Sequence, residues 1–160
     1  MKTIKTLLLS CILALASCTT DPCVDVTCYN DGVCDDGTCI CADWYEGADC
    51  STEERAKYFG NYIGTSSFFD DDGNFINNST DTISLSSNGS IVNELDADGV
   101  IFVLAASGMG DFDIPPTSIS DPDGTFIISG DGSFSGNLMT LNARFIYPYE
   151  TIDFTFTGSK

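Results

Sequence analysis

Six of the eight cysteines in this 160-residue chain lie between Cys23 and Cys50, and no cysteine follows them. A cysteine thiol can act as a nucleophile, a metal ligand or a disulfide partner. The chain contains no histidine, which excludes the mechanisms in which histidine activates serine or cysteine. The cysteines also do not form two Cys-x2-Cys pairs, as zinc knuckles do, so their clustering favours a set of disulfides.

Carboxylates are the second group of side chains that could carry chemistry, because paired carboxylates act as general acid and base and their oxygens suit calcium. Clusters occur at Asp70–Asp72, at Asp96 and Asp98, at Asp121 and Asp123, and at Asp131. Four of these residues precede a glycine, at Asp72-Gly73, Asp98-Gly99, Asp123-Gly124 and Asp131-Gly132. Asp-Gly pairs are typical of turns. We therefore expect strand reversals there and predict no enzyme, no metal and no cofactor.

The start of the chain resembles the signal of a bacterial lipoprotein. A charged head, Met1–Lys5, precedes the apolar run Thr6–Ala16, and Leu15-Ala16-Ser17-Cys18 resembles a lipobox. The apolar run is too short for a transmembrane helix. The resemblance implies that residues 1–17 are removed as a signal peptide and that Cys18 is acylated, for example with palmitate.

Lipidation at Cys18 would hold the protein on a membrane, since several acyl chains together make an effectively permanent anchor. Residues 18–22 would then form a lipidated tether. Many lipoproteins that stay at an inner membrane have an aspartate after the acylated cysteine, whereas this chain has Thr19. We therefore expect an exported protein, anchored at the outer membrane or exposed on the cell surface.

The six clustered cysteines follow the pattern C-x4-C-x5-C-x4-C-x-C-x8-C, with Tyr45 and Gly47 between the last two. Residues 23–50 therefore resemble an EGF-like module. Six cysteines allow fifteen pairings, and the connectivity of the resembled family implies the bonds Cys23–Cys34, Cys28–Cys39 and Cys41–Cys50. A segment this short cannot bury enough apolar surface to fold without such cross-links, and we expect it to act as a rigid spacer.

The charge of the chain limits its partners. After residue 18 the sequence has four basic residues against 24 acidic residues, a difference of −20. Nucleic acid is excluded as a favourable partner, because phosphate contacts require clustered lysine and arginine. Anionic lipid would also repel this surface, so the covalent lipid is the expected link to the membrane.

Residues 58–160 are predicted to form an all-β domain, after a linker at residues 51–57 with one or two helical turns. Strand-like segments occur at residues 80–85, 90–92, 99–105, 125–128, 140–147 and 152–157. Asn88-Gly89 predicts a two-residue hairpin turn. Seven or eight short strands indicate an antiparallel β-sandwich or a small up-and-down β-barrel, and periodicity does not distinguish the two.

Two resemblances extend this interpretation. The segment Tyr58-Phe59-Gly60-Asn61-Tyr62 is similar to the Gly-x-Tyr opening strand of lipocalin-like barrels, which implies a carrier of a small apolar ligand. The arrangement of lipobox, EGF-like module, glutamate-rich linker and β domain resembles small surface lipoproteins of Bacteroidota-type bacteria. That second resemblance implies no particular function.

Two further features are candidate surface sites. Apolar rings flank an acidic tip in a candidate contact loop, which consists of Phe68, Phe69, Asp70, Asp71, Asp72 and Phe75. The alternative for this segment is a hairpin whose rings fill the core. Asp81-Thr82-Ile83 matches the Asp-Thr/Ser-apolar pattern of O-glycosylation in the same bacterial group, so Thr82 is a candidate glycosylation site.

These observations predict a lipid-anchored, non-enzymatic protein of the cell envelope. The EGF-like module would be a stalk that presents the β domain to an unidentified protein or glycan. A lipocalin-like carrier of a small apolar ligand is the first alternative, and it requires a cavity of roughly several hundred Å³. A carboxylate-based hydrolase is the second alternative, and it requires two carboxyl groups that converge in one cleft.

Overall fold

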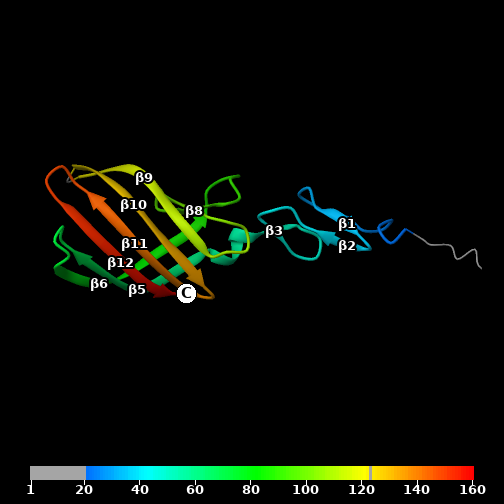
Figure 1. Cartoon of the computed structure of the whole chain (residues 1–160), viewed down its shortest axis with the longest axis horizontal. Helices are drawn as coiled ribbons and strands as arrows, with labels where there is room; N and C mark the ends of the chain where they lie inside the picture. The colour runs from blue at the N-terminus through cyan, green and yellow to red at the C-terminus, as the bar shows by residue number, and fades with distance from the viewer. Residues whose placement is uncertain (1–20, 123) are drawn as a thin grey trace, which may run out of the picture.

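The computed structural model describes residues 21–122 and 124–160, so the predicted signal peptide and Cys18 lie outside the described residues. The described chain forms a small disulfide-bonded module and a larger β-barrel, joined by a short 3-10 helix, η2 (Glu54–Tyr58) (Figure 1). Among the described residues, no helix is long and apolar enough to cross a membrane.

The disulfide module, residues 23–50, is held together by cross-links. Three bonds join Cys23 to Cys34, Cys28 to Cys39 and Cys41 to Cys50. These are the pairs that the EGF-like resemblance implies. Its short strands are β1 (Val33–Asp35), β2 (Thr38–Ile40) and β3 (Tyr45–Glu46), the last of which pairs with β4 (Thr52–Glu53). Among residues 21–50 only Cys50 is buried, so the disulfides replace the apolar core that this segment lacks.

The larger domain is a closed, eight-stranded antiparallel barrel (Figure 1). Its strands are β5 (Gly60–Phe69), β6 (Phe75–Ser87), β7 (Glu94–Ala97), β8 (Val100–Leu104), β9 (Asp111–Asp121), β10 (Gly124–Ser135), β11 (Leu138–Ile146) and β12 (Thr151–Ser159). Each strand pairs with the next along the chain, and β12 pairs with β5 to close the circle. The all-β prediction is confirmed, and closure identifies an up-and-down barrel instead of a sandwich.

Alternating residues along the strands place apolar side chains inside the barrel. In β11, Met139, Leu141 and Ala143 are buried, and the residues that follow each of them are more exposed. In the neighbouring strand β12, Phe156, which pairs with Leu141, is also buried. The predicted hairpin between residues 140–147 and 152–157 is confirmed by the β11–β12 ladder.

Aromatic rings fill the half of the barrel next to η2, which we call the closed half. The Tyr58 ring stacks on Phe134 with centroids 4.4 Å apart, and Phe134 contacts Phe112 at 4.9 Å. Phe112 in turn stacks on Phe102 at 4.8 Å. Such pairs stabilise a core by roughly 0.5–1.5 kcal/mol each beyond the effect of burial, so this half of the interior is a packed core.

The predicted turn at Asp131-Gly132 is wrong. Both residues lie inside β10, where they pair with β9 and β11, and the chain reverses after Ser135 instead. A Cβ atom at position 132 would collide with the ring of Phe112. Gly132 therefore makes room for the aromatic core, whereas the Asp98-Gly99 pair does occupy a turn, with φ values of 52° and 91°.

The predicted two-residue turn at Asn88-Gly89 is also wrong. The connection between β6 and β7 covers residues 88–93, so Ser90-Ile91-Val92 is a loop and not a strand. The loop wraps around the side chain of Arg55, which comes from η2 and is 1% exposed. A buried guanidinium needs acceptors for its donors, and the loop supplies them.

Arg55 binds main-chain oxygens of this loop with both terminal nitrogens. Its guanidinium donates to the carbonyl oxygens of Gly89, Ile91 and Glu94, and its Nε donates to a carboxylate oxygen of Glu53 at 2.8 Å. The helix η2 therefore seals one end of the barrel with a buried cation whose three nitrogens all have hydrogen-bond acceptors.

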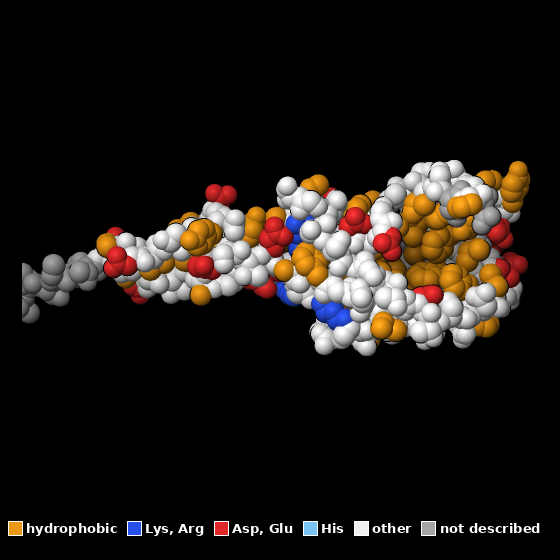
Figure 2. All heavy atoms as spheres, turned by 180° about the vertical axis from the view of Figure 1, so that it is seen from behind, with side chains coloured by type: hydrophobic (Ala, Val, Ile, Leu, Met, Phe, Trp, Pro, Cys, Tyr) orange, Lys and Arg blue, Asp and Glu red, His pale blue; other side chains and the backbone are white. Residues whose placement is uncertain are grey.

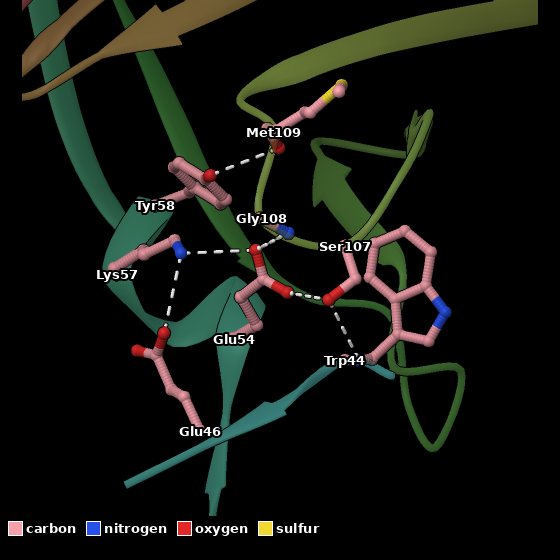
Figure 3. A network of polar contacts seen from close by, with 8 residues as sticks. All are labelled: Trp44, Glu46, Glu54, Lys57, Tyr58, Ser107, Gly108 and Met109. Atoms are coloured by element: carbon pink, nitrogen blue, oxygen red, sulfur yellow. Dashed lines mark hydrogen bonds and ion pairs between the residues drawn. The ribbon is translucent and has the colours of Figure 1, made fainter. Parts of the chain in front are cut away.

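Glu54, the neighbour of Arg55, joins the disulfide module to the barrel (Figure 3). Its carboxylate accepts hydrogen bonds from Ser107 Oγ and the Gly108 amide, each at 2.6 Å, and pairs with Lys57 Nζ at 3.1 Å. Its own amide donates to the Trp44 carbonyl at 2.8 Å. The Trp44 amide donates to the same Ser107 hydroxyl at 3.3 Å, so one residue of η2 connects the module with the β8–β9 loop.

The Glu54 network makes the stability of the protein depend on pH. Burial alone would raise the pKa of Glu54, but hydrogen bonds from Ser107 and Gly108 and the contacts with Lys57 outweigh it and lower the pKa below 4.5. A lowered folded-state pKa stabilises the protein above the unfolded value and is lost as the pH falls through the folded value.

We predict that Glu54→Gln lowers the free energy of unfolding by roughly 1–3 kcal/mol at pH 7, because charge-assisted hydrogen bonds are lost. The difference from the wild type should shrink as the pH falls below 4.5, where wild-type Glu54 also becomes protonated. Urea denaturation between pH 7 and pH 3 measures both quantities. The control Glu150→Gln, on an exposed turn, should match the wild type, and an E54Q variant of wild-type stability would contradict the role of Glu54.

Candidate functional site

The half of the barrel far from the disulfide module contains a cavity of about 260 Å³. Figure 2 shows it as a hollow lined by hydrophobic side chains. Its lining is drawn from every strand of the barrel except β5 and consists of Thr82, Ile83, Ala97, Asp98, Val100, Phe102, Ile114, Ile119, Phe126, Ile128, Leu141, Ala143, Phe145 and Phe154. The arrangement can hold a small apolar molecule.

Aromatic rings shape the cavity wall and its floor. Phe145 lies between Phe126 and Phe154, with ring centroids 5.7 Å from each. Phe102, which stacks on Phe112 of the closed half, borders the cavity on the side that faces the closed half. The floor is thus the top of the packed aromatic core, whose stacking keeps the cavity from extending through the barrel.

The cavity opens where β6 separates from the β7–β8 hairpin. The ladder between β6 and β7 has two residue pairs, Ser86–Asp96 and Ser87–Leu95, whereas residues 75–85 of β6 pair with β5. Thr82 and Ile83 border the opening on one side, and the β7–β8 turn borders it on the other. The long, one-sided pairing of β6 therefore creates the mouth.

The inner face of β6 becomes polar beside this mouth. Leu85, Ile83 and Asp81 alternate with more exposed residues, so they share the face that points into the barrel. Ser79, on the same face, donates a hydrogen bond from Oγ to Asp81 at 2.7 Å. The apolar cavity thus has a carboxylate next to its edge.

Ser66 of β5 extends this polar region. It is fully buried, and among the described residues its hydroxyl has no partner that meets full hydrogen-bond geometry. The hydroxyls of Ser66 and Ser79 nevertheless lower the pKa of Asp81, so Ser66 acts on the carboxylate as a nearby dipole without a well-formed bond. Asp81 therefore stays ionised, and the Ser66 oxygen retains capacity to accept a further hydrogen bond.

The candidate contact loop consists of the β5–β6 turn and the strand ends beside it, and its aromatic rings make different contacts. Phe68 contacts Phe154 of the cavity wall at 5.3 Å, whereas Phe69 contacts Phe75 at 5.9 Å, and Phe75 is 58% exposed. The Asp70 carboxylate accepts hydrogen bonds from the amides of Asp72 and Asn74. Asp70 thus shapes the turn, and of the three rings of the loop Phe68 packs on the cavity wall, whereas the half-buried Phe69 packs on the exposed Phe75.

The acidic clusters lie on separate elements of the barrel. Asp70–Asp72 occupy the β5–β6 turn, Asp96 and Asp98 the β7–β8 hairpin, and Asp131 the middle of β10. Asp123 lies outside the described residues. Among the described residues, no group of three or more acidic or cysteine side chains is arranged to hold a metal ion. Thr82 is exposed on β6 at the cavity mouth, and its glycosylation stays a prediction.

Sequence patterns predicted most of the strands but not β7, β9 or the cavity, and the predicted strand at residues 90–92 is a loop. The alternation in β11 indicated that Leu141, Ala143 and Phe145 face one side, yet their pattern is the same for a filled core and for a hollow. The signal that could have found it is the small residue Ala143 between large ones. The sequence marks Asp81 only through a glycosylation pattern, whereas its period-two spacing from Ile83 and Leu85 places it on the inner face of β6.

The chain matches no family model, and comparisons with curated proteins and with solved structures find no similar protein. The fold and the cavity therefore define its class directly. It is an eight-stranded up-and-down β-barrel with an apolar cavity open to solvent, preceded by a module with three disulfides.

We predict that two phenylalanines of β10 with similar burial differ in their contribution to stability. Phe134 is 8% exposed in the packed closed half, and Phe126 is 9% exposed beside the cavity. Phe134→Ala should lower the free energy of unfolding by roughly 3–5 kcal/mol, and Phe126→Ala by clearly less because it already borders empty space. Urea denaturation measures the difference, and equal losses would show that the cavity is filled in solution.

Proposed function

We propose that this chain is a lipid-anchored protein of the cell envelope whose barrel binds a small apolar ligand in its open cavity. The observation that carries the proposal is the apolar cavity of about 260 Å³ that opens to solvent beside β6. The lipobox resemblance supports the anchor, and the barrel is consistent with the lipocalin-like resemblance of its first strand. No catalytic step is part of the proposal.

The size of the cavity sets the size of the ligand. At about 30 Å³ per small group, the volume of a water molecule in the liquid, a cavity of about 260 Å³ holds roughly eight or nine non-hydrogen atoms. Each buried methylene contributes roughly 0.8 kcal/mol, and association costs offset part of this sum. A ligand with an eight-carbon chain gains about 6.4 kcal/mol from burial, so after association costs its dissociation constant should lie between about 20 μM and about 1 mM.

The position of the cavity supports a role in which the ligand arrives from the side away from the anchor. The disulfide module lies between the start of the described chain and the barrel (Figure 1). The hollow lies in the part of the barrel farthest from this module (Figure 2). An acylated Cys18 would hold the N-terminal end at a membrane, and the module would raise the mouth above it.

A second candidate function is the binding of a protein or glycan at the far tip of the barrel. Tyr149, in the β11–β12 turn, is 99% exposed, and Phe75 is 58% exposed. Exposed aromatic side chains are frequent in binding surfaces. Loss of partner binding in Tyr149→Ser, with ligand binding in the cavity unchanged, would favour this candidate.

We predict that the purified chain from residue 19, which keeps every described contact, binds 1-octanol in a single site by isothermal titration calorimetry. Ala143→Phe should weaken this binding at least about tenfold, a loss of about 1.4 kcal/mol, because its ring occupies the cavity. Ala105→Phe, on the exposed β8–β9 loop, is the matched control and should bind like the wild type. Absence of binding both by octanol and by charged ligands of the same chain length, for a wild-type chain with native circular dichroism, would overturn the ligand-binding proposal.

The anchor is tested separately. We expect mass spectrometry of the protein from native membranes to show a mature chain that begins at Cys18 with acyl groups on its sulfur and amino group. Cys18→Ser should release the protein from the membrane fraction, since the covalent lipid is the proposed attachment. A mature protein with unmodified Cys18 would contradict this part of the proposal.

A further inference from the structure

Carboxylates surround the mouth of the cavity. Asp98 is part of the cavity lining, and Asp81 shares the inner face of β6 with Ile83, which also lines it. In an up-and-down barrel the alternate turns lie at one end, so the β5–β6 turn with Asp70–Asp72 and the β11–β12 turn with Glu150 lie at the same end as Asp98. A charged group entering the cavity therefore meets negative potential.

Basic side chains do not balance this charge. The described lining of the cavity includes neither lysine nor arginine. The four basic residues after residue 18 have other partners. Arg55 of η2 binds carbonyl oxygens of the β6–β7 loop, and Lys57 pairs with Glu46 and Glu54. Arg144 pairs with Asp153, and Lys160 donates to the carbonyl oxygens of Lys57 and Phe59. Arg144 alone lies towards the open end, and its guanidinium forms two bonds to Asp153, at 2.7 and 2.9 Å.

The polar groups beside the cavity are suited to accept hydrogen bonds. The Asp81 carboxylate has one bond, from Ser79, in the described structure. The buried Ser66 hydroxyl has no partner of full geometry among the described residues, which is a cost that native structures usually avoid. A ligand donor could bond to the Asp81 carboxylate, which is partly exposed, whereas the fully buried Ser66 hydroxyl polarises that carboxylate from behind.

We propose that the ligand of the cavity is a small apolar amine, bound with its hydrocarbon chain among the phenylalanines and its ammonium group at Asp81 and Asp98. This inference rests on the proposed function, because it names the head group of the same ligand. An ammonium has three donors and no acceptor, which matches a mouth whose charged groups are the carboxylates of Asp98 in the lining and Asp81 beside it. A fatty acid would place a third negative charge beside these two carboxylates, and the described lining offers no cation to neutralise it.

The test compares three ligands of equal chain length, octylammonium, 1-octanol and octanoate, by calorimetry at pH 7 on the chain from residue 19. We expect octylammonium to bind at least about tenfold more tightly than octanol, a difference of about 1.4 kcal/mol, and octanoate to bind most weakly. The preference for octylammonium should decrease at about 0.5 M NaCl, because salt screens exposed charges.

Each outcome distinguishes the inference from the proposed function. If octanol binds as tightly as octylammonium, or if octanoate binds best, the amine inference is overturned and the apolar-ligand function stands. If none of the three binds, both are overturned.

Asparagine variants locate the charge effect. Asp98→Asn, on an exposed turn, and Asp81→Asn should each reduce octylammonium affinity several-fold while octanol affinity stays within about twofold, since roughly 1 kcal/mol is the scale of one partly exposed charge pair. Asp25→Asn, an exposed residue of the disulfide module, removes the same charge far from the mouth and should have no effect. Equal losses in D98N and D25N would show that net charge, and not the mouth, sets the preference.

Discussion

The pairing of β12 with β5 is the interaction on which the rest of the structure depends. Seven residue pairs, from Asp153–Phe69 to Ser159–Ile63, join the last strand to the first. Without them the strands would form an open sheet with two unpaired edges and no enclosed interior. The cost of closing so long a loop grows only slowly with its length, so the hydrogen bonds and buried rings of this seam can offset it.

Closure gives the barrel a fixed cross-section that the inward side chains must fill. An eight-stranded barrel is just wide enough to be filled by side chains or to hold one small ligand, and this barrel has one filled half and one half with an open cavity. Tyr58, Phe112 and Phe134 stack across the closed half. Beyond them the smaller residues Ala97 and Ala143 and the separation of β6 from β7 leave space open. The floor of the cavity is therefore a consequence of the aromatic core.

Local patterns in the sequence predicted local structure well. Alternation predicted the β11–β12 hairpin, and the resemblance to an EGF-like module implied the three disulfide pairs. Long-range features were not predictable, because the β12–β5 seam joins residues far apart and leaves no periodicity of its own. The Asn88-Gly89 and Asp131-Gly132 turns failed for tertiary reasons, since Arg55 reshapes the first segment and Phe112 requires a glycine in the second. The cavity depends on volumes summed over several strands.

The two buried charges of η2 link the cavity to the module that carries the barrel. Glu54 and Arg55 are adjacent and of opposite sign, yet each binds other groups: Glu54 binds the β8–β9 loop and Arg55 the β6–β7 loop. A buried charge without its partners is strongly destabilising. Any other orientation of the Trp44 segment against the barrel would break hydrogen bonds around Glu54. Glu54 and Arg55 therefore seal the closed end of the barrel and also fix how the module is oriented relative to the cavity mouth at the other end.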